Sequence, residues 1–141
     1  KVFEVSPEYG EIERKKILLL EDDPDFMIVL RELLETNSYH VIAAKDGVEG
    51  LKQIMAEDFD VIICDLLMPN LPGDMFYVAV ERTRPHLCKR FIFMTGHKGD
   101  PKFDAFIRRV GAVMVWKPFQ LQDLLDAMKV VLQKTQRSGA A

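Results

Sequence analysis

A regular alternation between short apolar runs and amphipathic segments constrains this chain more than any other feature of its sequence. Each run is short and almost wholly apolar, and the segment after it carries apolar residues at helical spacing. Strands that are apolar throughout are typical of a parallel sheet covered on both faces. The predicted strands are residues 17–20, 41–44, 61–64, 91–94 and 112–116.

Five helices are predicted between and after these strands. Pro24 suits the first turn of the first helix, Asp46-Gly47 opens the second, Asp74 caps the third and Pro85 ends it. The residues expected to face the sheet are Phe26, Val29, Leu30, Leu33 and Leu34; Val48, Leu51 and Met55; Phe76, Ala79 and Val80; Phe103, Phe106, Ile107 and Val110; and Leu121, Leu124, Leu125, Met128 and Leu132.

Alternating strands and helices predict an α/β fold with right-handed crossovers. For five such units the common arrangement is a flavodoxin-like, doubly wound parallel sheet with strand order 2-1-3-4-5 and helices on two faces. The winding then reverses between the first and third strands. A ligand site is expected there, at the carboxyl ends of the strands.

Composition limits which classes of protein and of binding partner fit this chain. The chain has 141 residues, 48% of them hydrophobic, which suits one domain with a real core. A net charge of −3 argues against direct binding of nucleic acid, and no apolar run reaches the roughly 20 residues of a membrane span, so we expect no membrane contact. Two cysteines without close-spaced partners favour a reducing, cytoplasmic setting.

The domain is predicted to cover residues 15–134. Residues 1–14 are interpreted as a linker or extension and residues 135–141 as a frayed polar tail. Because the chain begins with Lys1, it is interpreted as a piece of a longer protein.

Candidate functional residues lie where the predicted strands end. Asp22 and Asp23 follow the first strand, and Asp65 follows the third. Clustered carboxylates repel one another, and a hard cation such as Mg²⁺ relieves that repulsion through oxygen ligands. Thr95 adds a hydroxyl group and Lys117 adds an ammonium group at the next two strand ends.

This set suits phosphoryl transfer to a carboxylate, because the protein mainly positions and neutralises the transferred group. Each residue alone has an ordinary structural explanation. Asp23 before Pro24 is a good helix N-cap, and Asp65 is acceptable as a polar end of a strand. The functional hypothesis therefore depends on their joint placement.

The same residues resemble the receiver domain of two-component signalling. The matching stretches are residues 19–24, 65–69 with Pro72-Gly73, 94–96 and 115–119. The resemblance implies that Asp65 is the phosphoacceptor and that Asp22, Asp23, Asp65 and the Leu67 carbonyl hold Mg²⁺ or Mn²⁺. It also implies that Thr95 and Lys117 bind the phosphoryl oxygens.

The resemblance further implies a signalling domain that is no separate enzyme but assists its own phosphotransfer and dephosphorylation. Expected partners are a histidine kinase or a histidine phosphotransfer domain, a fused kinase or effector domain, and a second copy through the fourth helix, fifth strand and fifth helix. Residues 91–96 resemble receivers of hybrid sensor histidine kinases. One departure is Met114, where the family often has a switch aromatic.

Two other interpretations stay open. One is a degenerate receiver that serves only as a protein-interaction module. The other is a small Mg²⁺-dependent phosphohydrolase of the haloacid-dehalogenase type, a class that needs Asp two residues after the nucleophile, where this chain has Leu67.

Overall fold

Five parallel strands form the central sheet of the protein, in the order β4-β3-β5-β6-β7. In chain order this is the predicted 2-1-3-4-5 arrangement, which is confirmed. The computed structural model describes residues 2–6, 10–96 and 100–139. The strands of this sheet are β3 (Lys16–Leu20), β4 (His40–Ala44), β5 (Val61–Asp65), β6 (Phe91–Thr95) and β7 (Val113–Trp116).

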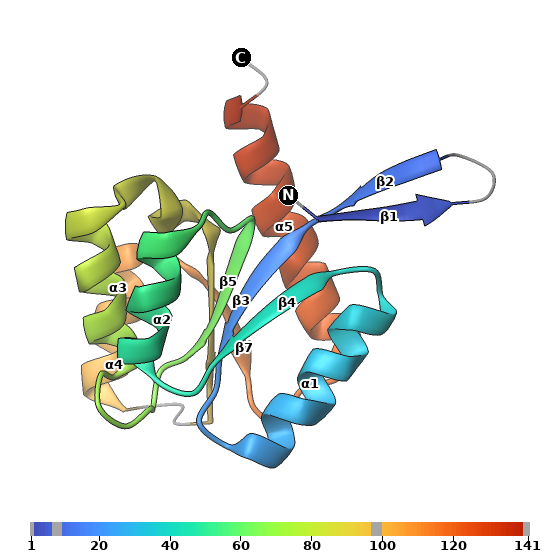
Figure 1. Ribbon diagram of the computed structural model, residues 1–141. Helices are drawn as coiled ribbons and strands as arrows, with labels where there is room; N and C mark the ends of the chain where they lie inside the picture. Colours follow the sequence, from blue (N-terminus) through green and yellow to red (C-terminus); the bar gives the residue numbers. More distant parts are fainter. Residues whose placement is uncertain (1, 7–9, 97–99, 140–141) are drawn as a thin grey trace.

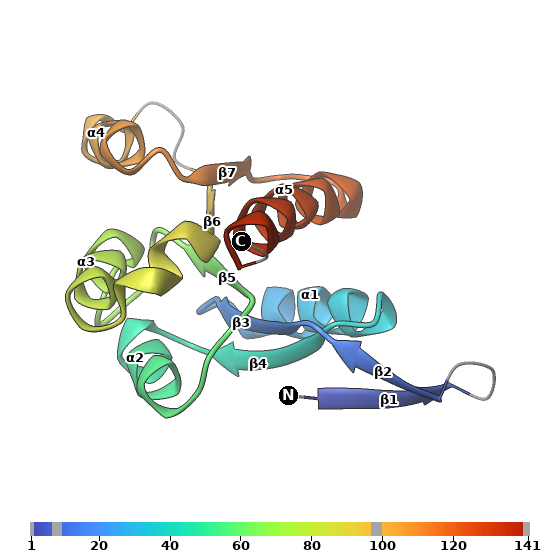
Figure 2. The ribbon, with the colours of Figure 1, turned by 90° about the horizontal axis from the view of Figure 1, so that it is seen from above.

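Helices cover both faces of the sheet, as Figures 1 and 2 show. Helices α1 and α5 lie on one face, and α2, α3 and α4 lie on the other. Among the described residues, no helix is both long and apolar enough to cross a membrane. The bounds are α1 (Pro24–Thr36), α2 (Gly47–Ala56), α3 (Gly73–Thr83), α4 (Pro101–Val110) and α5 (Leu121–Gly139), with a 3₁₀ helix η1 (Pro85–Arg90) after α3.

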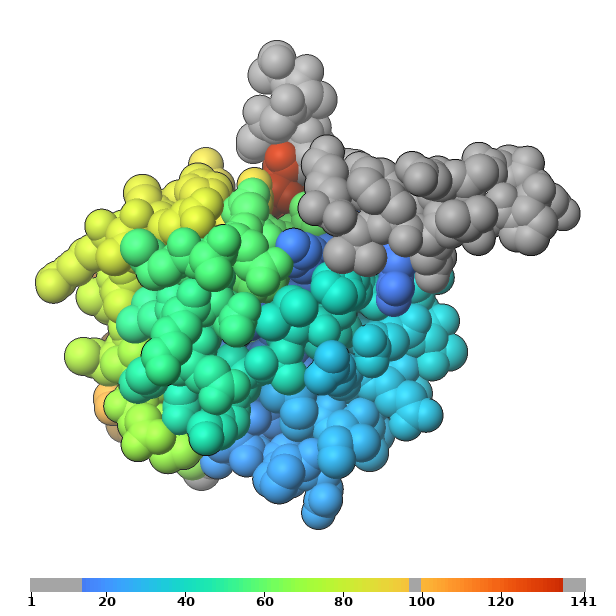
Figure 3. All heavy atoms as spheres, viewed as in Figure 1, coloured from blue at the N-terminus to red at the C-terminus, as the bar shows by residue number. Residues whose placement is uncertain are grey.

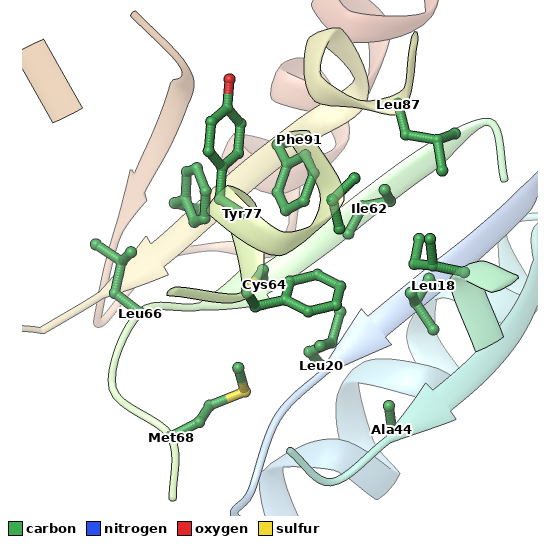
Figure 4. Packing of buried hydrophobic residues seen from close by; sticks show 14 of the residues in the cluster. Leu18, Leu20, Ala44, Ile62, Cys64, Leu66, Met68, Tyr77, Leu87 and Phe91 are labelled. Carbon is green, nitrogen blue, oxygen red and sulfur yellow. The ribbon is translucent and has the colours of Figure 1, made fainter. Parts of the chain in front are cut away.

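Successive side chains of each strand enter two separate cores. Ile17 and Leu19 of β3 pack with residues of α1 and α5, whereas Leu18 and Leu20 pack with residues of α2, α3 and α4. Figure 4 shows the second core, where side chains of β3, β5 and α3 gather. Because β5 is buried along its whole length, the strand that ends at Asp65 is held from both faces.

The predicted buried faces of the first two helices were partly wrong. In α1, Leu30 and Leu34 are buried, but Val29 and Leu33 are exposed. In α2 the buried residues include Gly50, whereas Val48 and Met55 are 46% and 62% exposed.

The reason in α2 is the close approach of its backbone to the sheet. A Cβ atom on Gly50 would lie 2.4 Å from Leu20 Cδ2, so the glycine side of the helix faces inward. Figure 3 shows side chains of α1 and α2 on either side of edge strand β4.

The third helix begins differently from the prediction. Pro72 occupies the N-cap position and Asp74 lies in the first turn, so the prediction that Asp74 caps this helix was wrong. The helix ends at Thr83, just before the predicted stop at Pro85. The fourth helix buries Phe103 and Phe106 as expected.

Regular structure extends beyond the predicted domain of residues 15–134 on both sides. Strands β1 (Val2–Ser6) and β2 (Gly10–Arg14) form an antiparallel hairpin within the segment interpreted as a linker or extension. It leaves the domain from the amino-terminal end of β3 (Figure 1), and Arg14 Nη2 donates to Tyr39 O at 2.6 Å. Helix α5 continues to Gly139, so the predicted frayed tail is helical there. Residues 7–9, 97–99 and both chain ends, which include parts of a predicted loop and of the tail, lie outside the description.

Gly73 brings the start of α3 directly against the end of β5. Its N–H donates to Leu66 O at 2.9 Å, and a Cβ atom there would lie 2.6 Å from Asp65 O and 2.8 Å from Leu66 Cα. These neighbours are backbone atoms, so they cannot turn away as a flexible side chain would. Only glycine fits without displacing the backbone of Asp65.

We therefore expect Gly73→Ala to lower the free energy of unfolding by about 1–3 kcal/mol, measured by urea denaturation. Gly96→Ala is the matched control, because its Cβ atom would meet Lys117 Cβ at an ordinary 3.8 Å. Equal losses in the two variants would contradict the packing argument.

Candidate functional site

The sheet register brings the candidate residues to one edge. Leu20 pairs with Cys64, Asp65 with Met94, and Thr95 with Trp116. Glu21, Asp65, Thr95 and Lys117 therefore lie at adjacent strand ends, although they come from distant parts of the sequence. The Lys117 N–H donates to Thr95 O at 2.8 Å, which continues the pairing beyond β7. The structure brings Asp65, Thr95 and Lys117 to the carboxyl edge as expected, together with Glu21, which was not expected there.

Lys117 joins two buried carboxylates. Its Nζ lies 2.7 Å from Asp65 Oδ2 and 2.8 Å from Glu21 Oε1, while Asp65 is 5% and Glu21 2% exposed. Burial lowers the pKa of Lys117, but its hydrogen bonds to Asp65 and Glu21 outweigh burial, so the pKa is raised overall. The ammonium group thus stays charged at neutral pH and offsets the repulsion between the two carboxylates. The Lys117–Pro118 peptide bond is cis.

Three acidic side chains form a compact cluster. Glu21, Asp22 and Asp65 each offer a carboxylate oxygen, and these oxygens lie within 4.8 Å of one another. Partial burial, followed by the hydrogen bond with Glu21, raises the pKa of Asp22. A group of oxygens this close is the donor set that Mg²⁺ or Mn²⁺ prefers, with room left for water.

The sequence prediction placed the acidic set one residue too late. Asp23 was expected beside Asp22 as a metal ligand, but its Oδ1 accepts hydrogen bonds from Asp25 N at 3.0 Å and Phe26 N at 3.3 Å. Asp23 is therefore the N-cap of α1, with Pro24 in the first turn. The acidic cluster holds Glu21 instead.

Glu21 was missed, and of the two signals that favour it only the Asp23-Pro24 pair is visible in the sequence alone, because the other is the strand register. Parallel register places the residue after Leu20 beside the residue after Cys64, which is Asp65. Aspartate directly before a proline is also a good helix cap, and a carboxylate that caps a helix has one oxygen less for a metal. Together these signals favour Glu21 and Asp22 over Asp23.

The loop after β5 contacts the phosphoacceptor candidate directly. Leu67 N donates to Asp65 Oδ1 at 3.1 Å, so one carboxylate oxygen is held by the loop and the other by Lys117. The Leu67 side chain is exposed. The role of its carbonyl as a metal ligand stays a prediction, as does that of the buried Thr95 side chain in binding phosphoryl oxygens.

An aromatic pair lies beside Lys117. The rings of Phe26 and Phe119 meet edge to face at 6.0 Å, and Lys117 Nζ lies 4.9 Å from the centre of the Phe26 ring. A pocket of about 400 Å³ is lined by these three residues with Asp23 and Pro118. The Phe26 ring therefore faces the ammonium group within the range of a cation–π attraction.

Met114, where a switch aromatic is common, lies half-buried in β7 beside Phe93. Aromatic rings are abundant in the adjacent core, where Phe93 contacts Tyr77 and Phe106 at centroid distances of 5.9 and 5.3 Å. These rings belong to β6, α3 and α4. Packing between β6 and α4 is therefore aromatic even though β7 contributes a methionine.

Comparison with known proteins agrees with this geometry. Residues 17–129 match the family model of the response regulator receiver domain. The chain is 31% identical over 121 residues to the response regulator receiver protein CpdR of Brucella abortus, covering 84% of this chain and 97% of CpdR. It is 27% identical over 119 residues to the transcriptional regulatory protein GlrR of Escherichia coli, covering 84% of this chain but only 26% of GlrR.

Solved structures show the same fold. A CheY-like response regulator receiver domain protein from Methanospirillum hungatei superposes with a TM-score of 0.81 at 27% identity, covering 89% of this chain and 99% of that one. The chemotaxis protein CheY4 of Vibrio cholerae gives 0.76 at 29% identity, with 85% and 100% coverage. The matched region contains all five parallel strands and the acidic edge described above, and the chain belongs to the family of response regulator receiver domains of two-component systems.

Proposed function

We propose that Asp65 accepts a phosphoryl group from a phosphohistidine of a histidine kinase or histidine phosphotransfer domain, in a reaction that needs Mg²⁺ or Mn²⁺. The observation that carries this proposal is the contact of the Lys117 ammonium group with Asp65 and Glu21 at the carboxyl edge of the sheet. It pairs a buried carboxylate with a fixed positive charge, beside a cluster of acidic oxygens.

The residues present fit a divalent cation. Asp22 and Asp65, with Glu21 and the Leu67 carbonyl, are proposed to hold it, because hard cations take carboxylate, carbonyl and water oxygens. When bound, the cation neutralises negative charge on the phosphoryl oxygens. Lys117 is proposed to contact the same oxygens as a point charge, and Thr95 to donate its hydroxyl hydrogen.

The transfer itself uses the Asp65 carboxylate as the nucleophile. A lone pair on one of its oxygens forms the new P–O bond while the P–N bond of the phosphohistidine breaks. The electron pair of the broken bond returns to the imidazole nitrogen. The domain positions the carboxylate and neutralises charge but needs no separate acid or base for this step.

We further propose that residues 15–134 form the functional unit. This unit acts in the cytoplasm, and its partner-binding surface changes when Asp65 carries phosphate. A homodimer through α4, β7 and α5 is one form of that surface. Fusion to a kinase or an effector domain is proposed for the whole protein. The chain spans 26% of the length of GlrR and 12% of the length of the sensor kinase CckA of Brucella abortus.

Phosphorylation of Asp65 can be tested directly by intact-mass spectrometry. With acetyl phosphate and Mg²⁺, the native domain should gain one phosphoryl group and Asp65→Asn should gain none. Asp60→Asn is the matched control. Asp60 directly precedes β5, at the end of the strand opposite to Asp65, and its carboxylate accepts a hydrogen bond from Lys16 N. An unchanged mass for the native domain would contradict the proposal and favour a degenerate receiver.

The revised acidic set makes a second prediction. Asp22→Asn should weaken Mg²⁺ binding at least about tenfold, because a carboxylate ligand is lost. Asp23→Asn should bind Mg²⁺ as the native domain does, since asparagine caps a helix as well as aspartate. Isothermal titration calorimetry measures both affinities, and a loss in Asp23→Asn alone would restore the original sequence prediction.

The third prediction concerns Lys117 in metal-free protein. Lys117→Met should lower the free energy of unfolding by roughly 1–3 kcal/mol at pH 7 in EDTA, because Glu21 and Asp65 lose their buried cationic partner. Since the folded pKa of Lys117 is raised above 10.5, this contribution is complete below that pH and disappears as the pH rises through the folded value.

Lys102→Met is the matched control for this measurement. Lys102 is 64% exposed and lies 3.9 Å from Asp74, so its removal should change the free energy of unfolding by less than about 0.5 kcal/mol. Urea denaturation from pH 7 to pH 11 compares the variants. Equal stability of native protein and Lys117→Met would show that the ammonium group does not offset the acidic repulsion.

A further inference from the structure

The loop between β5 and α3 is held by a side chain from a different unit of the fold. Asn70 lies in this loop with a positive φ of 67°, and its Nδ2 donates to Asp46 Oδ2 at 2.8 Å. Asp46 is the N-cap of α2, so the contact joins residues 24 positions apart. Asparagine tolerates this backbone conformation better than most residues. Its side-chain amide links the loop to the start of α2.

Asp46 is built to accept this hydrogen bond. The residue is 5% exposed, and its Oδ1 accepts from Glu49 N at 2.9 Å, so both carboxylate oxygens have partners. The Glu49 N–H first, and then the Asn70 amide, hold the pKa of Asp46 below its usual value. An ionised carboxylate strengthens the bond to Asn70.

The backbone packs closely at the same place. A Cβ atom on Gly47 would lie 2.5 Å from Leu71 O and 2.7 Å from Leu71 Cβ, so the start of α2 rests directly on the loop. The start of α3 rests on the other end through Gly73. Between these two contacts lies Leu67, whose N–H holds Asp65 Oδ1.

From these contacts we propose that Asp46 and Asn70 are positioning residues for the phosphoacceptor site. Their hydrogen bond keeps the loop where Leu67 N contacts Asp65 and where the Leu67 carbonyl serves the proposed cation. The pair thereby sets the Mg²⁺ affinity and the phosphorylation rate of Asp65 without contacting either. This inference rests on the proposed function and adds two residues to it, one of them on α2.

The test exchanges the two partners. Asn70→Asp tolerates the positive φ but sets two carboxylates against each other. The double variant Asp46→Asn with Asn70→Asp restores a donor and an acceptor, keeps an N-cap on α2 and has the net charge of the native protein. Asn70→Gly removes the donor without adding charge and suits the same backbone, so it keeps the test open if Asn70→Asp fails to fold.

Four measurements separate positioning from general stability. Mg²⁺ binding is titrated by the fluorescence of Trp116, the single tryptophan, and the rate of phosphorylation by acetyl phosphate is measured. Amide hydrogen exchange of residues 66–72 is followed in metal-free protein, and the thermal midpoint of unfolding reports general stability. Asn70→Asp and Asn70→Gly should bind Mg²⁺ roughly tenfold more weakly and react more slowly, as loss of an outer partner usually does. Amide hydrogen exchange of the loop should be faster in the single variants, while the thermal midpoint of unfolding changes little. The double variant Asp46→Asn with Asn70→Asp should recover most of each loss.

Unchanged Mg²⁺ affinity and rate in both single variants would overturn the inference, and so would failure of the exchanged pair to recover. Failure of the proposed function has a different signature, because the native protein itself would then take no phosphate. In that case the Mg²⁺ titration and the exchange of loop amides still decide whether the pair positions the loop.

Discussion

Repulsion between carboxylates at the edge of the sheet is the constraint on which the site depends. Glu21 and Asp65 are buried within reach of one ammonium group, and Asp22 lies beside them. Such a group of charges is unfavourable unless it is neutralised. Lys117 supplies one positive charge from the end of β7, which β6 separates from β5 in the sheet, and the remaining negative charge favours a divalent cation.

The rest of the fold holds these charges in place. Strand β5 is covered on both faces, so Asp65 ends a rigid element rather than a mobile loop. The loop between β5 and α3 contacts Gly73 at the start of α3 and is joined to Asp46 at the start of α2 through the hydrogen bond of Asn70. The close backbone contacts at Gly47 and Gly73 and the partly buried hydrogen bond of Asn70 to Asp46 are proposed to limit how far Leu67 moves relative to the carboxylate. This rigidity is what a positioned nucleophile requires.

Much of the fold was predictable because its signals are local. An apolar run of four residues such as 61–64 indicates a strand buried on both faces, and the alternation of such runs with helices indicates parallel order. The inward faces of α1 and α2 were less predictable. A glycine has no side chain to register in a hydrophobic pattern, yet Gly50 brings α2 onto Leu20 and turns Val48 and Met55 outward. The pairing of β1 with β2 as a hairpin also escaped prediction, because these strands pair with each other outside the alternation of strands and helices.

The sequence by itself determined which strand ends hold the polar candidates, because each candidate lies at or just after the end of an apolar run. It did not determine which two of the three consecutive acids, Glu21, Asp22 and Asp23, face Asp65. Tertiary structure decided that through strand register, which sets Glu21 beside Asp65, and through the start of α1, which uses Asp23 as its cap. Nor did the sequence indicate that Asp46 contacts Asn70, because a hydrogen bond between two loops depends on how closely α2 packs against the loop after β5.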